Sequence, residues 1–163
     1  MTLTLVRVDD RVIHGQTMTR WTKKFPVDGI LVFGDDIAHD QLRRKVLKAA
    51  ANELKVGIYT VEQAPDKVKK GIESKKNFFL ISNSPQNFSK LVDMGVDFGK
   101  TLNIGPMNMR DGTKMVGKTC YIDQKDYEAF ENIYNHGIDI QLQILPEDDI
   151  KHWPEMKAKY DAQ

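Results

Sequence analysis

Short apolar runs rich in β-branched residues alternate along this chain with longer segments of helical periodicity, and this alternation limits the fold more than any other feature. The runs lie at residues 3–8, 29–34, 56–61, 77–82, 101–104, 119–122 and 138–145. The alternation predicts an α/β fold with a mostly parallel central sheet, of about seven strands, and helices on both faces. No linker or internal repeat interrupts the pattern, so we expect one domain over residues 1–163, with a short polar tail from about residue 148.

Several of the expected helices carry signals at their ends. Asp40 and Asp123 stand where N-cap residues are needed, and Pro85 suits the first turn of a helix. Gly137 stands where the helix that begins near Asp123 should end. The polar segment beyond Pro146 is expected to add a short helix.

Charge and composition exclude several classes of partner. The formal net charge is +1, so nothing indicates a nucleic-acid partner. No apolar run approaches the ~20 residues that span a bilayer, and the N-terminus enters a strand-like pattern with no signal-peptide architecture. Cys120 is the single cysteine, which suits a reducing compartment. We therefore expect a cytoplasmic protein.

A candidate site follows the first expected strand. Ligands of parallel sheets bind outside the carboxyl ends of the strands, at a switch point in strand order. The turn from the first strand to the first helix lies at such an end, and residues 7–16 read RVDDRVIHGQ. The turn itself, after Val8, thus places two acids, a cation and a histidine where the fold is expected to hold a site.

These residue types suit phosphoryl transfer through histidine. The neutral imidazole of His14 is a nucleophile, and a carboxylate such as Asp10 can accept a hydrogen bond from one ring nitrogen. Arg11 can offer a planar fork to phosphoryl oxygens, while Gly15 permits close backbone approach and the helix start attracts an anion. From the residues alone, an alternative stays open: His14 is a structural hydrogen-bonding residue, and Asp9 and Asp10 simply cap the turn.

Residues 7–16 resemble the signature of the mannose/fructose/sorbose IIB family of bacterial sugar phosphotransferase systems. In that family Arg-[Ile/Val]-Asp-[Asp/Asn]-Arg-Leu-Ile-His-Gly-Gln follows the first strand, and here Val12 stands where leucine is commoner. The likeness extends to residues 80–85, LISNSP, and to residues 102–107, LNIGPM, where Pro106 replaces the commoner second glycine. It covers about residues 1–148.

The resemblance implies a phosphocarrier enzyme, a protein-N(pi)-phosphohistidine–sugar phosphotransferase. A IIA protein or domain would phosphorylate His14, which would pass the group to a sugar entering through membrane IIC and IID subunits. Asp10 and Arg11 would orient the ring and contact the phosphate, with Gly15 and Gln16 beside them. The chain would be cytoplasmic and peripherally associated with the membrane subunits. The sugar (mannose, fructose, sorbose or an amino sugar), the reacting ring nitrogen and the oligomeric state, a homodimer included, stay open.

Loops after the fourth and fifth strands are expected at the rim of this site, because their strands end at the same edge of the sheet. They bring Ser82, Ser84 and Gly105, whose polar groups either contact phosphate or close turns. The loop after the fifth strand also carries methionines that either form an adaptable docking surface or fill gaps beneath the loop: Met107, Met109 and Met115.

The other residues of interest are expected to be structural. His39 suits a solvated loop, His136 the last turn of a helix, and His152 a tail that packs back on the domain. The four histidines lack metal-ligand spacing, so neither a metal nor another cofactor is expected. Cys120 is expected to be buried. Lysines within residues 67–76 suit a solvated helix face or, alternatively, an anionic membrane surface.

Three competing classes fit the residues less well. A receiver-like phosphoaspartate domain needs an acceptor aspartate at the end of a later strand and a lysine after the fifth, whereas residues 60–62 read TVE and Lys100 precedes the fifth strand. A nucleotide-binding module needs a glycine-rich loop after the first strand, which this sequence lacks. A non-catalytic regulatory domain of the same fold has no chemical need for His14.

Overall fold

Nine strands and seven helices make up the part of the chain that the structure describes. This computed structural model describes residues 2–163, and all their side chains except those of Thr2, Gln16 and Thr17. The elements follow in the order β1 (Thr2–Val8), α1 (Gly15–Lys24), β2 (Gly29–Phe33), α2 (Asp35–Ala38), α3 (Gln41–Ala50), β3 (Lys55–Tyr59), α4 (Ala64–Glu73), β4 (Asn77–Ser82), α5 (Pro85–Asp93), β5 (Thr101–Ile104), β6 (Lys114–Gly117), β7 (Cys120–Ile122), α6 (Gln124–Asn135), β8 (Asp139–Leu142), β9 (Lys151–His152) and α7 (Trp153–Asp161). None of the helices described is long and apolar enough to cross a membrane.

Seven of these strands form one sheet in the order β3-β2-β4-β1-β5-β8-β9. Neighbouring strands are parallel except β8 and β9, which are antiparallel. The last residue of β1, Val8, lies beside Ser82 of β4 and Ile104 of β5. The predicted α/β fold with a mostly parallel, seven-stranded sheet is confirmed, and the carboxyl ends of β1, β4 and β5 meet at one edge.

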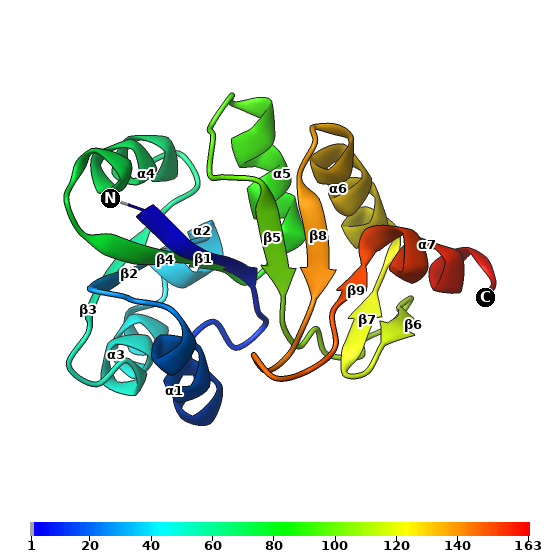
Figure 1. Ribbon diagram of the computed structural model, residues 1–163, viewed down its shortest axis with the longest axis horizontal. Helices are drawn as coiled ribbons and strands as arrows, with labels where there is room; N and C mark the ends of the chain where they lie inside the picture. Colours follow the sequence, from blue (N-terminus) through cyan, green and yellow to red (C-terminus); the bar gives the residue numbers. More distant parts are fainter. Residues whose placement is uncertain (1) are drawn as a thin grey trace.

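The helices cover both faces of the sheet. Helices α1 and α3 lie on one face, while α4, α5 and α6 lie on the other (Figure 1). Helix α1 follows β1 and α5 follows β4, so two adjacent strands lead to helices on opposite faces. Their connecting loops therefore diverge at the end of β1, which is the switch point where α/β proteins bind ligands.

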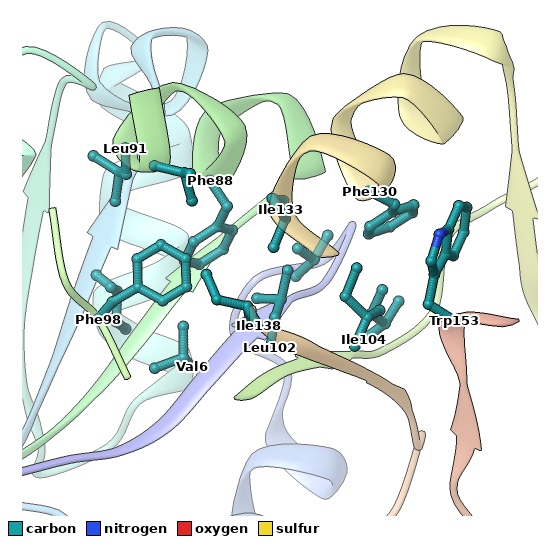
Figure 2. Packing of buried hydrophobic residues seen from close by; sticks show 14 of the residues in the cluster. Val6, Phe88, Leu91, Phe98, Leu102, Ile104, Phe130, Ile133, Ile138 and Trp153 are labelled. Atoms are coloured by element: carbon teal, nitrogen blue, oxygen red, sulfur yellow. The ribbon is translucent and has the colours of Figure 1, made fainter. Parts of the chain in front are cut away.

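The larger core lies between the sheet and helices α4 to α7. Figure 2 shows Phe88 of α5 and Ile133 of α6 packed toward Leu102 of β5. The Phe88 ring also meets Phe33 and Phe98 edge to face, with centroids 4.9 and 5.3 Å away. Full burial of side chains of this size contributes ~1.5–3 kcal/mol each, so this cluster holds α5 and α6 firmly on the sheet.

The smaller core lies under α1 and α3. Met18 and Trp21 of α1 and Leu47 of α3 pack with Val32 and Ile81 of the sheet. Trp21 is 2% exposed, and its indole N–H donates to a backbone carbonyl 3.1 Å away. Because α1 is held in this way, the residue that precedes it, at the edge of the sheet, is also held in place.

The helix ends agree with the sequence analysis. Asp40 accepts the backbone N–H of Arg43 at 3.0 Å and caps α3, and Asp123 accepts that of Asp126 at 2.8 Å and caps α6. Pro85 opens α5. Gly137 follows α6 with φ of 85°, a left-handed conformation that glycine adopts without strain.

The expected sixth strand, residues 119–122, does not join the main sheet. It forms β7, which pairs antiparallel with β6, and β6 itself lies where a continuous loop was expected. Met107, in the loop after β5, pairs with the edge of β7 that faces it. The N–H of Met107 donates to the carbonyl of Thr119, and the carbonyl of Met107 accepts the N–H of Tyr121. The seventh strand of the main sheet is β9, which lies in the segment beyond about residue 148 that was expected to be a polar tail.

The C-terminal segment packs against the rest of the domain. Trp153 is fully buried against Phe130, and its indole N–H donates to Oε1 of Glu131 at 2.6 Å. Lys157 donates to Oε2 of the same carboxylate at 3.0 Å. His152 lies 2.9 Å from Asp139 of β8. The expectation that His152 and Trp153 pack the tail onto the domain is confirmed, and α7 supplies the expected helix.

Glu131 should make stability depend on pH. Burial tends to raise its pKa, but the hydrogen bonds from Trp153 and Lys157 outweigh burial and hold the pKa below its ordinary value. The ionised form thus contributes stability above the unfolded-state pKa of about 4.3, and this contribution is lost as pH falls through the lower folded value. In calorimetry, we expect the melting temperature of Glu131→Gln to fall less than that of the wild type as the pH is lowered through this range. Glu155→Gln is the control, because Glu155 is exposed. Parallel curves for all three proteins would contradict this assignment.

Candidate functional site

The candidate site is the loop Asp9–His14, which joins β1 to α1. Its backbone is tied to the ends of both neighbouring strands: Asp9 donates its N–H to the carbonyl of Ser82 at 3.0 Å, and Asp10 donates to that of Pro106 at 3.1 Å. Pro106 serves here as an acceptor only, so its missing N–H costs this contact nothing. The loop is therefore held from two sides.

A strained residue lies in the middle of the loop. Val12 has φ of 62°, a conformation that β-branched residues rarely adopt, and its side chain is 1% exposed. Its N–H donates to the carbonyl of Asp9 at 2.9 Å, and both Val12 and Ile13 pack in the core under α1. Strain of this kind costs of the order of 1–3 kcal/mol, so the surrounding contacts must hold the loop in this shape.

The imidazole of His14 is paired with a buried carboxylate. Its Nε2 lies 2.9 Å from Oδ2 of Asp9, and the two residues are 8% and 1% exposed. An ionised carboxylate only accepts hydrogen bonds, so Nε2 of the neutral ring is the donor. The other nitrogen, Nδ1, then keeps its lone pair, which gives the ring one defined nucleophilic atom.

Arg7 lies beneath this pair and is itself 1% exposed. It donates to four acceptors: Asp9 Oδ2 at 3.3 Å, the carbonyls of Gln143 at 2.9 Å and Ile144 at 3.1 Å, and the side-chain oxygen of Asn103. Burial lowers the pKa of the Arg7 guanidinium from its ordinary value, and the charge of Asp9 opposes that effect. Arg7, Asp9 and His14 thus form a hydrogen-bonded chain that leads from the interior to the imidazole at the edge of the sheet.

Gly105 leaves room for this chain. A Cβ at that position would lie 2.3 Å from NH2 of Arg7 and 2.8 Å from Oδ2 of Asp9, and the contacts of Arg7 prevent it from moving aside. We expect Gly105→Ala to lower the free energy of unfolding by about 1–3 kcal/mol in urea titrations. Gly15→Ala is the control, because a Cβ there meets nothing within 4 Å. Equal stability of both variants would show that Arg7 can yield.

The expectation that Asp10 orients His14 is wrong, because Asp9 does so. Alternate residues of an extended strand share a face, so Asp9 falls on the same side as Arg7, where α1 packs. Asp10 instead accepts the backbone N–H of Asn108 at 2.5 Å. Arg11 is exposed, and its backbone N–H donates to Asp9 Oδ1 at 2.9 Å. The two-residue spacing between Arg7 and Asp9 was the signal that could have identified the partner.

The predicted rim residues prove to have mixed roles. Gly15 is exposed at the start of α1, and the side chain of Gln16 lies outside the described residues. Ser82 donates its hydroxyl to the carbonyl of Phe33 at 2.6 Å, and Ser84 caps α5. Ser84 thus makes a local capping contact, whereas the hydroxyl of Ser82 ties β4 to the neighbouring strand β2.

The other singled-out side chains lie in contrasting places. Met107 is 1% exposed and belongs to the core, whereas Met109 and Met115 are 73% and 43% exposed. Cys120 is buried as expected, and burial raises the pKa of its thiol to about 12, so it is not a reactive group at neutral pH. Among the described residues, no three or more histidines, cysteines or acids are grouped so that they could hold a metal ion.

One cation beside the loop was missed. Arg43 of α3 donates NH2 to the carbonyl of Asp10 at 3.3 Å, while its NH1 lies 3.7 Å from Asp36. No local pattern places it there, because it is separated by 33 residues from Asp10 and reaches the loop only through the packing of α3 beside α1.

Fold and site together define the class: a single α/β domain whose switch point carries a histidine held by a buried carboxylate. The chain belongs to the sorbose-subfamily IIB components of the phosphotransferase system, and the model of that family matches residues 3–163. The resemblance seen in the sequence is therefore confirmed, and the match continues through the tail that the resemblance did not cover.

Relatives and solved structures agree with this assignment. The chain is 33% identical over 153 residues to the fructose-specific EIIB component of Bacillus subtilis (strain 168), with 91% of each chain covered. It matches the crystal structure of the IIBSor domain of the sorbose permease from Klebsiella pneumoniae with a TM-score of 0.89, 31% identity and 97% of each chain covered. It is also 30% identical over 162 residues to the mannose-specific EIIAB component of Escherichia coli (strain K12), covering 99% of this chain and 50% of that protein.

Proposed function

We propose that this chain is the phosphocarrier of a sugar phosphotransferase system and carries the phosphoryl group on Nδ1 of His14. The observation that carries the proposal is the 2.9 Å contact between Nε2 of His14 and the buried Asp9. This contact leaves Nδ1 with its lone pair at the edge of the sheet. The hydrogen bond to Asp9 thus fixes which nitrogen of His14 is available to a phosphorus atom.

The reaction follows from these atoms. The lone pair of Nδ1 attacks the phosphorus of a donor phosphohistidine, a new N–P bond forms, and the donor imidazole leaves with the electrons of the old one. Positive charge develops on the His14 ring, and Asp9 stabilises it through Nε2–H. In the second transfer a sugar hydroxyl oxygen attacks the phosphorus and its proton passes to solvent. The N–P bond breaks, its electron pair returns to Nδ1, and the ring of His14 is neutral again.

The phosphoryl oxygens need donors, and the start of α1 supplies them. The first N–H groups of a helix have no acceptor within the helix and favour an anion. Gly15 begins α1 and is exposed, so the backbone is accessible there. The exposed Arg11 adds a cation beside it, and Asp10 helps to fix the loop. No metal or other cofactor is needed in this scheme.

The relatives support a proposal for the partners and the location. The mannose-specific relative is named an EIIAB component, and this chain matches half of it, which supports a IIA protein or domain as the donor. Membrane IIC and IID subunits would bring the sugar, so the chain would work in the cytoplasm at the membrane surface. Relatives are named for fructose, sorbose, N-acetylgalactosamine and mannose, which supports a sugar or amino sugar of that group as the acceptor.

Intact-mass spectrometry tests the proposal. The protein is incubated with phosphoenolpyruvate, the general phosphotransferase proteins and a IIA donor, beside His14→Ala and His136→Ala, whose histidine is exposed at the end of α6. We expect one acid-labile, alkali-stable phosphoryl adduct on the wild type and on His136→Ala, and none on His14→Ala. An adduct that is still present on His14→Ala would show that another residue is phosphorylated. If several IIA donors give no adduct on the wild type, the result would favour a regulatory role.

A further inference from the structure

The loop between β5 and β6, residues 105–113, holds Asp10 from two directions. Its Pro106 carbonyl accepts the Asp10 N–H at 3.1 Å, and its Asn108 N–H donates to the Asp10 carboxylate at 2.5 Å. This loop therefore shapes the His14 loop from outside, and its own position determines whether Asp10 is held. What anchors the loop is thus relevant to the site.

Arg110 anchors it. Its guanidinium forms ion pairs with Asp126 and, at 3.3 Å, with Asp123, both at the start of α6. Its NH1 donates back to the carbonyl of Asn108 at 3.4 Å. A single side chain therefore joins the N-terminus of α6 to the residue whose N–H holds Asp10.

Asp126 is a firm attachment point. It is 2% exposed, accepts the side-chain N–H of Gln86 at 2.8 Å, and accepts the backbone N–H of Asp123 at 3.0 Å. Burial raises the pKa of Asp126, and the charge of Arg110 acts in the opposite direction. Burial also disfavours the charge of Arg110, but Asp126 outweighs it and the pKa of Arg110 lies above its ordinary value. The ion pair stabilises both charges, and α5, α6 and the loop meet at this point.

We propose that Arg110 and Asp126 form a clamp that positions Asp10, and through it the His14 loop, for phosphoryl transfer. This role rests on the proposed function of His14. Arg110 acts through Asn108 and Asp10, so it is a positioning residue. The strained backbone at Val12 is the reason that outside support matters, because a strained loop released from its contacts relaxes away from the reactive geometry.

Hydrogen exchange tests the clamp independently of any activity. We expect Arg110→Gln to speed exchange of the Asn108 and Asp10 amides about tenfold, while amides in the middle of β4 stay protected. Arg110→Lys keeps the charge and should fall between wild type and Arg110→Gln. The matched control is Lys157→Gln, because Lys157 of α7 is a cation as exposed as Arg110 and is paired with Glu131, elsewhere on α6. Unchanged exchange at both amides in Arg110→Gln would overturn the clamp.

Kinetics test its consequence. In phosphorylation by a IIA donor, we expect Arg110→Gln to lower kcat about tenfold with KM changed less than twofold, Arg110→Lys to recover part of the loss, and Lys157→Gln to match the wild type. A raised KM with unchanged kcat would overturn the proposal, because Arg110 would then contact the donor directly. If the wild type itself accepts no phosphoryl group, the proposed function fails, and the exchange experiment still decides the clamp.

Discussion

Asp9→Asn is expected to slow phosphorylation of His14 by about 10²–10⁴-fold, as losses of this size follow when a carboxylate that fixes a catalytic imidazole becomes an amide. The Asp9 carboxylate accepts from Nε2 of His14, from Arg7 and from the backbone of Arg11. An amide offers one acceptor oxygen in place of two, and its NH₂ group turns a donor toward other donors. The ring then loses its fixed tautomer and the partner for its developing charge. Rapid-quench single-turnover measurements with a phosphorylated IIA donor give the rate.

Asp10→Asn is the matched control for that experiment. Asp10 is adjacent in sequence and also carboxylic, but its side chain accepts only the Asn108 N–H among the hydrogen bonds described. We expect its rate to fall by no more than about tenfold, because the loop keeps its other ties. A loss in Asp10→Asn as large as that in Asp9→Asn would mean that the direct contact of Asp9 with His14 contributes no more to the transfer than the tie between Asp10 and Asn108.

Arg7→Met is expected to lower the free energy of unfolding by about 3–5 kcal/mol, the range seen when one partner of a buried ion pair is removed. Methionine fills much of the same space but donates to none of the four acceptors that Arg7 serves. Asp9 would then be a buried carboxylate without its cation, and the carbonyls of Gln143 and Ile144 would lose their donor. Urea titration followed by circular dichroism measures the loss.

Two comparisons separate burial from charge in that result. Arg20→Gln removes an exposed arginine paired with Glu147 and should change stability by less than about 1 kcal/mol. The double variant Arg7→Met with Asp9→Asn should lose less than the sum of the single variants, because the two side chains share one interaction. Strict additivity would show that Arg7 and Asp9 stabilise the fold separately, and that Arg7 does not support the partner of His14.

Features that depend on residues close together in the chain could be predicted from the sequence alone. The alternating runs predict the parallel sheet, and Asp40, Pro85 and Asp123 mark helix starts because each acts on groups within about three residues. The location of His14 was predictable for a related reason: the end of the first strand of a parallel sheet lies at the edge where ligands bind.

Contacts between distant residues could not be read in this way. Arg7 lies 136 residues from Gln143, and Arg43 lies 33 residues from Asp10. The pairing of β7 with β6 rather than with the main sheet depends likewise on where the loop after β5 lies. Each depends on which strands are neighbours and which faces the helices cover, and that is the outcome of packing the whole chain.

The choice between two adjacent acids shows most clearly what the sequence determines and what the tertiary structure decides. The order of residues placed Asp9 and Asp10 close to His14 in the chain, and either could have served as its partner. Only the packing of α1 and Trp21 over the face that carries Arg7 turned Asp9 toward His14 and left Asp10 to the loop after β5. The chain order determines which groups are available at the site, and burial against distant elements decides which of them meet, because a buried charge is stable only where its partners are also held.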